Sequence, residues 1–253
     1  MQDPGALKIE LGVSGGYVCV AAIRSRPPHG ASRLFEGRLP EEAPTLARRL
    51  YSLCSRAQGA ASVAAVEAAL GRRPSPDARR AEAAGVLAER VFESLRAMVF
   101  GWPSAATFAR RASAPLREAA AAAEAIARGD ASLARLADIR AALDELENMI
   151  SRKDPSVEAV IVAGRTAAGS GFSAVECARG RLYHLAQVNG NGRLQVYAHV
   201  APTEWNFHHA GPLAAQLLGA RLGRAEAAQI AGERLVALVD PCVAAEVTVR
   251  EAN

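Results

Sequence analysis

The chain has 253 residues, of which half are hydrophobic and 22% are charged, and its net charge is +4. This composition is typical of a globular protein with a substantial core. Only 5% of the residues are aromatic and the basic residues are scattered, so no nucleic-acid partner is expected, because such a partner needs a basic stripe and stacking rings. No membrane span is expected, since no run approaches ~18 apolar residues. The first residues do not resemble a secretory signal and the four cysteines show no C-x-x-C spacing, which indicates a cytoplasmic protein with reduced thiols.

The N-terminal part predicts strands followed by helices. Apolar and polar residues alternate over residues 7–23, with Gly15-Gly16 at a turn, which predicts a β-hairpin. Residues 41–49 and residues 60–70 have the apolar spacing of helices.

The middle of the chain, residues 75–150, is rich in alanine and has helical spacing. It predicts a bundle of three or four helices, with breaks at Trp102-Pro103 and Gly129-Asp130. One apolar stripe consists of Leu87, Val91, Leu95 and Met98.

Beyond residue 155 the composition favours strands again. Residues 157–162 predict a buried strand, and Gly164–Gly171 predicts a flexible loop. Asn189–Gly192 indicates a hairpin, because Asn and Gly tolerate a positive φ. The two arms of this hairpin are residues 181–188 and 193–200. The last predicted elements are helices over residues 210–222 and 225–239.

Together these patterns indicate an α+β fold that is predominantly helical, with small β-hairpins beside a helical bundle. We expect a single domain over residues 1–253. Its three segments are residues 1–70, 71–155 and 156–253, of which the middle one is the bundle.

Two short motifs, one near each end, carry most of the chemical information. They are Arg49–Gln58 (RLYSLCSRAQ) and Asp240–Ala245 (DPCVAA). They resemble the R-x-C-G-x-C-x-x-x-H and D-P-C-x-x-C-x-x-H motifs of nickel-iron hydrogenase large subunits. In that family four thiolates hold nickel and an iron that carries one CO and two cyanides. Each motif here keeps one cysteine, Cys54 or Cys242. The residues at the other ligand positions are Tyr51, Gln58, Ala245 and Thr248.

Further segments extend the resemblance in the same order along the chain. Glu176–His184 resembles E-A-P-R-G-x-L-x-H, and Val200–Asn206 resembles V-x-P-T-x-W-N. The ordered match covers about residues 5–70 and 160–250, while the helical middle matches no motif. The resemblance implies a reduced nickel-iron hydrogenase large-subunit-like fold.

The resemblance also implies a ligand set. Cys54 and Cys242 would be the metal ligands, since soft thiolates suit a low-spin iron that already carries CO and two cyanides. Arg179 would lie beside one cyanide, and Thr203, next to Pro202, would donate a hydrogen bond to the other. A charge-assisted hydrogen bond of this kind contributes about 1.5–3 kcal/mol.

The pattern is similar to the HupK/HoxV kind of hydrogenase maturation protein. This implies a non-catalytic scaffold that binds the Fe(CN)2(CO) unit transiently, without nickel, and passes it to the apo large subunit. The implied partners are HypC/HypD-type maturation proteins and the hydrogenase large-subunit precursor. Catalysis is not expected, because two thiolates are lost and Ser32 stands where the proton-relay glutamate belongs.

Several alternatives stay open at this point. Cys242 corresponds to a terminal nickel ligand, so either the C-terminal loop is displaced or Cys242 has another role. Cys177 could be a third thiolate, since on one strand it would face the same way as Arg179, although packing in the core is the favoured interpretation. The protein could also be a metal-free chaperone that imitates the large subunit, or a hydrogen-activating enzyme that contains nickel.

Other reactive side chains have structural explanations. We expect Cys19 in the core of its strand, His184 as a hydrogen-bonded structural histidine and Glu176 as the anchor of a turn. His208-His209 resembles a metal pair, but adjacent side chains are expected to point apart.

Overall fold

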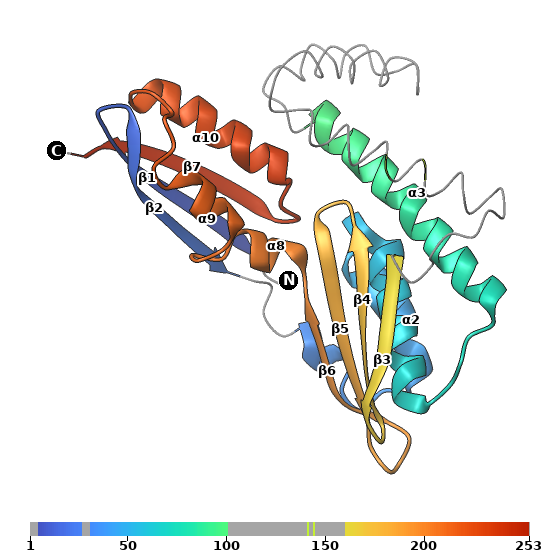
Figure 1. Ribbon diagram of the computed structural model, residues 1–253. Helices are drawn as coiled ribbons and strands as arrows, with labels where there is room; N and C mark the ends of the chain where they lie inside the picture. Colours follow the sequence, from blue (N-terminus) through green and yellow to red (C-terminus); the bar gives the residue numbers. More distant parts are fainter. Residues whose placement is uncertain (1–4, 27–30, 101–140, 142–143, 145–159, 253) are drawn as a thin grey trace. The chain divides into compact units, whose positions relative to one another are not determined.

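The computed structural model describes residues 5–26, 31–100, 141, 144 and 160–252 (Figure 1). Its contacts divide the chain into two compact units, and each unit combines segments that are far apart in the sequence. The terminal unit comprises Met1–His29, Arg96–Leu133 and Pro202–Asn253, and the central unit comprises Gly30–Leu95 and Ala134–Ala201. The single domain over residues 1–253 stays a prediction.

The sheet of the terminal unit pairs strands from both ends of the chain. β1 (Ala6–Ser14) pairs antiparallel with β2 (Tyr17–Arg26) and parallel with β7 (Ala244–Glu251), which gives the order β2-β1-β7. The predicted hairpin over residues 7–23 is therefore confirmed, whereas β7 is not among the predicted elements. One face of β1 is buried at alternate positions, as expected for a half-covered strand. The buried residues are Leu7, Ile9, Leu11 and Val13.

Among the described residues, three further helices belong wholly to the terminal unit. They are α8 (Pro202–Asn206), α9 (Pro212–Leu217) and α10 (Ala225–Val239). α10 packs against β7, and the apolar side chains of α9 and α10 join the core beneath β1. The two predicted C-terminal helices are confirmed, but α9 is shorter than expected because Leu218 adopts an extended backbone with φ −64° and ψ 123°.

The central unit contains an antiparallel sheet in which each strand pairs with the next one along the chain. The hairpin predicted around Asn189–Gly192 is confirmed. The strands are β3 (Ile161–Ala167), β4 (Ser170–Cys177), β5 (Gly180–Val188) and β6 (Leu194–Val200). Of the strand predicted over residues 157–162, only residues 160–162 lie in the described part of the chain. Val160 and Ile161 are buried.

The loop predicted over Gly164–Gly171 is wrong. These residues form the tip and arms of the β3–β4 hairpin, and Gly164 pairs with Phe172. A β-carbon at Gly164 would lie 2.7 Å from the ring of Phe172, so the glycine makes room for this ring on the sheet. The glycines therefore serve close packing within strands, which sequence alone cannot distinguish from loop flexibility.

Helices of the central unit precede its sheet. They are α1 (Ala43–Leu50), α2 (Ser55–Leu70) and α3 (Pro76–Phe100), with 3₁₀ turns at Ala31–Leu34, Pro40–Glu42 and Ser52–Cys54. The predicted helix over residues 60–70 is confirmed and begins earlier, directly after Cys54. In the predicted apolar stripe of α3, Leu87 is buried and Val91 is half-buried. The side chains of Leu95 and Met98 lie outside the described residues. Of the predicted bundle beyond α3, only residues 141 and 144 are described.

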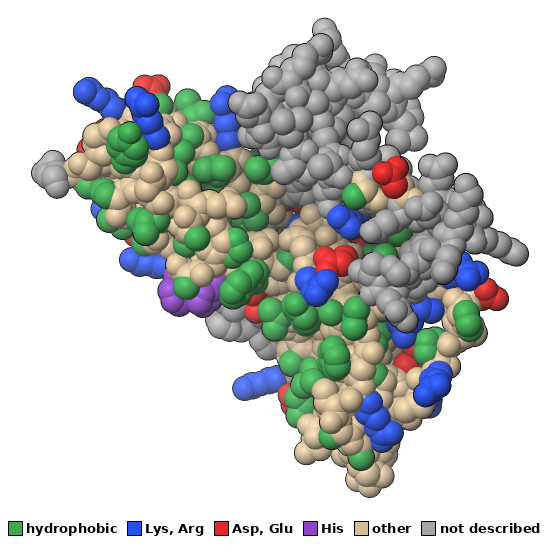
Figure 2. Space-filling model, viewed as in Figure 1, with side chains coloured by type: hydrophobic (Ala, Val, Ile, Leu, Met, Phe, Trp, Pro, Cys, Tyr) green, Lys and Arg blue, Asp and Glu red, His purple; other side chains and the backbone are tan. Residues whose placement is uncertain are grey.

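α2 is the central element of this unit, with one face on β3, β4 and β5 and its other sides toward α1 and α3. Its buried face is mostly alanine, and small side chains let the backbones of helix and sheet approach closely. The opposite face of the sheet carries exposed apolar side chains, among them Val162, Tyr183 and Val200 (Figure 2). The prediction of a predominantly helical fold underestimated the strands, because the described residues contain two sheets.

Gly171 is the closest approach between β4 and α2. A β-carbon there would lie 2.3 Å from the backbone nitrogen of Ala69 and 2.5 Å from the carbonyl oxygen of Ala65. Because neither atom is the end of a flexible side chain, we expect Gly171→Ala to lower the free energy of unfolding by about 1–3 kcal/mol. Denaturant unfolding of the whole chain measures this. Gly190→Ala is the matched control, since a β-carbon there meets no atom within 4 Å, and an equal loss in both variants would contradict the close packing.

Candidate functional site

Cys54 lies where the 3₁₀ turn before α2 ends. It occupies the N-cap position of α2, with φ −137° and ψ 44°, and is half-buried. Glu89 on α3 caps the first turn of α2 by accepting hydrogen bonds from the backbone N–H groups of Arg56 and Ala57, at 2.7 and 2.9 Å. Burial raises the pKa of Glu89, and these two hydrogen bonds oppose the rise. Cys54 is thus held at the positive end of the α2 dipole, where an anionic ligand is favoured.

A series of buried side chains links Cys54 to the sheet. The amide nitrogen of Gln58 lies 3.7 Å from Cys54 Sγ, and the amide oxygen lies 2.8 Å from His184 Nε2. His184 Nδ1 lies 2.6 Å from the hydroxyl of Tyr197, which lies 2.7 Å from Ser62 Oγ. Burial lowers the pKa of His184 to about 3, so its ring is neutral. His184 is therefore a hydrogen-bonded structural histidine, as predicted.

Tyr51, which stands where the family has its first early cysteine, packs against a second histidine. The Tyr51 hydroxyl lies 3.3 Å from His199 Nδ1, and the two ring centroids are 4.7 Å apart. Burial lowers the pKa of His199. An aromatic ring therefore fills the lost ligand position. This ring packs on the same side of the sheet as His184, and the rings of His184 and His199 lie 5.9 Å apart.

Cys177 and Arg179 lie at the tight β4–β5 turn. Cys177 is the last residue of β4, and Ala178 and Arg179 form the turn before β5 begins at Gly180. The alternation of a strand therefore does not extend to Arg179, and the expectation that Cys177 and Arg179 face the same way on one strand is wrong. The Cys177 thiol donates a hydrogen bond to the Gly180 carbonyl at 3.1 Å and packs in the core with Leu182. Burial raises its pKa to about 11, which favours the packing interpretation of Cys177.

Arg179 is buried and ion-paired. Its guanidinium Nη2 donates to Glu93 Oε2 on α3 at 2.8 Å, and both side chains are almost fully shielded from solvent. Glu93 and Glu89 were missed by the sequence reasoning. Helical spacing could have found them, because Glu89 lies three and Glu93 seven residues after the buried Val86, so both share its side of α3. Carboxylates on a buried helix face usually have a partner.

In the terminal unit, Thr203 and Cys242 are in contact. Thr203 Oγ1 lies 3.2 Å from Cys242 Sγ, and the same oxygen accepts a hydrogen bond from the Cys242 backbone N–H at 3.3 Å. Pro202 and Thr203 are buried at the start of α8, and Cys242 is half-buried in the segment before β7. The structure thus brings together two of the predicted site residues that are 39 positions apart in the sequence.

The turn that leads to Cys242 is fixed by Asp240. Asp240 ends α10 in the left-handed conformation, with φ 53°, which Asp tolerates better than most residues. Its carboxylate oxygens accept hydrogen bonds from Arg96 Nη2 at 3.3 and 3.2 Å. Arg96 was missed by the sequence reasoning, since no local pattern connects it with Asp240.

The predicted site residues are divided between the two units. Thr203 and Cys242 lie together in the terminal unit, and Cys54 and Arg179 lie in the central unit. The binding of one iron by both Cys54 and Cys242 stays a prediction.

Three of the structural explanations can be compared with the described residues. Glu176 forms an ion pair with Arg181 across the β4–β5 hairpin, as expected for the anchor of a turn. Cys19 is exposed, and its placement in the core is wrong, because the β1–β2 register skips it as a bulge. The rings of His208 and His209 do not point apart, since their centroids are 4.1 Å apart.

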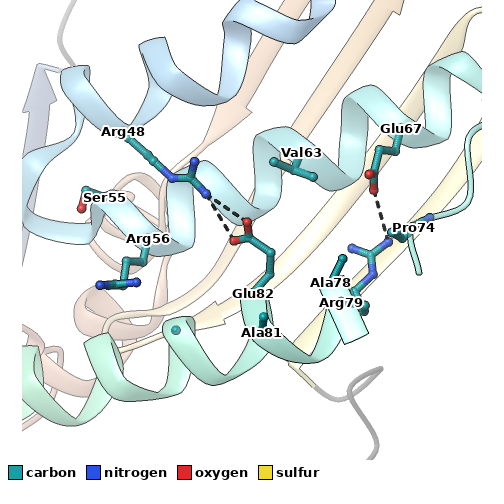
Figure 3. A pocket seen from close by; sticks show the side chains of 11 residues that line it. Arg48, Ser55, Arg56, Val63, Glu67, Pro74, Ala78, Arg79, Ala81 and Glu82 are labelled. Carbon is teal, nitrogen blue, oxygen red and sulfur yellow. Dashed lines mark hydrogen bonds and ion pairs between the residues drawn. The ribbon is translucent and has the colours of Figure 1, made fainter. Parts of the chain in front are cut away.

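A cavity of about 590 Å³ lies in the central unit along α1, α2 and α3 (Figure 3). Its wall carries the ion pair of Arg48 with Glu82 at 3.1 Å and the looser pair of Arg79 with Glu67 at 4.0 Å. Burial raises the pKa of Glu67. Opposite charges thus alternate along this wall, and none of the predicted ligands lines it.

Comparisons with known proteins show the family and the fold of the chain. A family model described as nickel-dependent hydrogenase matches residues 104–248. The hydrogenase expression/formation protein HupK of Rhizobium leguminosarum bv. viciae is 32% identical, and the alignment covers 98% of this chain and 97% of that protein. The hydrogenase expression/formation protein HoxV of Cupriavidus necator is 38% identical over 87 residues, which is 33% of this chain and 21% of that protein.

Among solved structures, the [NiFeSe]-hydrogenase of Dm. baculatum is similar in fold. The TM-score is 0.64 at 12% identity, and the superposition covers 93% of this chain and 96% of that chain. Within the described ranges, no helix has the length and apolar character needed to cross a membrane. The near-full-length similarity and the shared fold show that the chain belongs to the HupK/HoxV type of hydrogenase expression/formation proteins, which are related to the nickel-iron hydrogenase large subunit.

Proposed function

We propose that the protein is a non-catalytic, cytoplasmic scaffold of hydrogenase maturation. It holds the Fe(CN)2(CO) unit as cargo on Cys54 and Cys242 and passes it to the apo large subunit. HypC/HypD-type maturation proteins supply the unit, and the hydrogenase large-subunit precursor receives it. The similar proteins are named hydrogenase expression/formation proteins, which supports the maturation role.

The contact between Thr203 and Cys242 carries this proposal. A buried hydroxyl 3.2 Å from a thiol sulfur can turn its hydrogen toward that sulfur or toward an acceptor bound beside it. The nitrogen of a cyanide on a sulfur-bound iron is such an acceptor. Cys242 is therefore the ligand and Thr203 the donor to the cargo, and Cys242 holds iron at a position where the family motif has a terminal nickel ligand.

The charges of the central unit also fit the cargo. Iron(II) with two cyanides is neutral, and two thiolates make the bound unit negative, so it needs a nearby cation. Arg179 is a buried cation of this unit and is ion-paired with Glu93 at 2.8 Å. We place its guanidinium beside one cyanide, as the family motif implies, because its fixed N–H donors suit an anionic acceptor.

The reduced ligand number suits a carrier. Two thiolates hold an iron more weakly than the four of the large subunit, which favours transfer to the four-cysteine acceptor. Nickel has no thiolates left to bind it, so the scaffold carries iron alone and does not split hydrogen.

Infrared spectroscopy tests the proposal directly. Protein purified without oxygen from cells that make the maturation machinery should show one CO stretch and two cyanide stretches. In Thr203→Val, which keeps the shape of the side chain but removes its hydrogen, one cyanide stretch should shift and the other should stay.

Thr166→Val is the matched control for that shift, because Thr166 is exposed on β3 and its hydroxyl bonds to Ser170 at 2.8 Å and not to a proposed site residue. Identical cyanide stretches in wild type and Thr203→Val would contradict the role of Thr203. The absence of all three stretches, with every partner present, would favour the metal-free chaperone.

A further inference from the structure

β7 is an edge strand of the terminal unit. In the described part of the chain it pairs with β1 on one side and with no strand on its other side (Figure 1). A groove of about 500 Å³ lies there between β7 and α10, and its wall includes Val236, Ala237 and Val247. An edge strand of this kind can pair with another strand unless it is covered or otherwise protected.

The backbone groups of β7 face inward and outward in turn. The backbone N–H of Ala252 donates to the carbonyl of Val13 on β1 at 2.8 Å, so even-numbered residues direct their backbone groups toward β1 and odd-numbered residues direct theirs away. In agreement, the side chain of Gln229 on α10 donates to the carbonyl of Val247 at 2.8 Å. This bond uses one of the two lone pairs of that carbonyl, and the outward N–H groups of Val247 and Val249 are left for another strand.

The sequence of β7 is complementary to itself in the antiparallel direction. If Thr248 lies opposite Thr248 of a second copy, the outward-facing Val247 and Val249 lie opposite each other, as the ladder requires. Glu246 then lies opposite Arg250, and the two-fold symmetry repeats each contact. Centring the pair on Glu246 or on Arg250 instead would place like charges opposite each other, which is destabilising. The charges therefore select the register that is centred on Thr248.

The two charged side chains are available for this contact. Arg250 is exposed and forms no ion pair within the described ranges. Glu246 has only a loose ion pair with Lys8 at 4.0 Å, in which 66% of each side chain is exposed. Such a pair contributes little to stability, so Glu246 can turn toward a second cation at small cost.

We propose that two copies of the chain form a dimer by pairing their β7 strands antiparallel about Thr248. The three-stranded sheet of each terminal unit then continues into that of the other copy. The open edge of β7 receives the partner strand, and the Glu246–Arg250 pairs set its direction and register. This interaction needs no iron and is independent of the scaffold role, although β7 begins two residues after Cys242.

Analytical ultracentrifugation of the full-length protein over a series of concentrations tests the dimer. Glu246→Arg or Arg250→Glu places like charges at both symmetric contacts and should raise the dissociation constant of the dimer about 30-fold. An equimolar mixture of these two variants should recover the dimer, because each copy then supplies the charge that the other lacks. Arg24→Glu is the matched control, since Arg24 is an exposed cation on β2 at the opposite edge of the same sheet.

A cross-link tests the register. In a Cys19→Ala background, which removes an exposed thiol, Thr248→Cys should give a covalent dimer on oxidation with diamide. Directly opposed residues of such a pair have Cα atoms about 4.5 Å apart, which a disulfide can span. Arg250→Cys in the same background is the control, because its two copies would be about 13 Å apart along the strands and should not be joined.

Two results would overturn the dimer. A wild type that sediments as a monomer at every concentration, together with no cross-link in Thr248→Cys, leaves the edge of β7 to a strand of another protein. A dimer that both charge reversals leave intact places the contact on another surface. Circular dichroism shows whether each variant folds, and the cross-link keeps the test decisive where a charge reversal does not.

Discussion

Replacing Cys242 or Cys54 by alanine is expected to remove the iron cargo and to stop hydrogenase maturation. Residues that merely support metal ligands change affinity about 10–100-fold, so loss of one of two protein ligands should lower iron occupancy by at least about 100-fold. The infrared CO stretch of the purified scaffold measures occupancy, and hydrogen uptake by cells measures maturation. Both should fall in each variant.

Cys19→Ala is the control for these substitutions. Cys19 is an exposed thiol on the bulge of β2, so both readouts should equal those of the wild type. If either proposed ligand can be lost with maturation intact, the metal-free chaperone is the better description of the protein. Nickel in the purified protein together with hydrogen-dependent dye reduction would instead support an enzyme.

Glu93→Ala is expected to destabilise the central unit by about 3–5 kcal/mol. The substitution removes the carboxylate that lies 2.8 Å from the buried Arg179 guanidinium, and breaking a buried ion pair by removing one partner has a cost of this size. Denaturant unfolding of the full chain measures the loss. The comparison variant is Glu82→Ala on the same helix, whose partner Arg48 is partly exposed, and we expect a loss of about 0–1 kcal/mol there.

A double variant separates stability from cargo binding at this ion pair. Glu93→Leu with Arg179→Met replaces both charges by apolar side chains, which is often neutral for stability. The double variant should unfold near the wild-type denaturant concentration yet lose the CO and cyanide stretches. A stable double variant with unchanged cyanide stretches would show that Arg179 does not touch the cargo.

Secondary structure was predictable where the signal is local. The hairpins around Gly15-Gly16 and Asn189–Gly192 follow from turn residues between alternating strands, and both are present. β7 was not predicted, although Val247 and Val249 alternate with polar residues, because this run is short and forms an edge strand of its sheet. It becomes a strand only by pairing with β1, more than two hundred residues earlier in the chain.

The same distinction holds for the candidate site. Cys54, Arg179, Thr203 and Cys242 were named from motif spacing, since a ligand keeps its chemical neighbours in the sequence. The partner of Arg179 was not found from the sequence, because Glu93 is 86 positions away, and the pairing of Gln58 with His184 spans 126 positions. No local pattern records such pairs.

The amino-acid sequence by itself determined the family, the positions of the thiols and the loss of the other ligands, because these depend on residue identity and order. Only the tertiary structure decided which hydroxyl meets which thiol, which carboxylate neutralises the buried guanidinium, and which way Gln58 faces. The physical reason is that burial makes hydrogen bonding and charge pairing obligatory, and burial is created by segments that meet only when the chain folds.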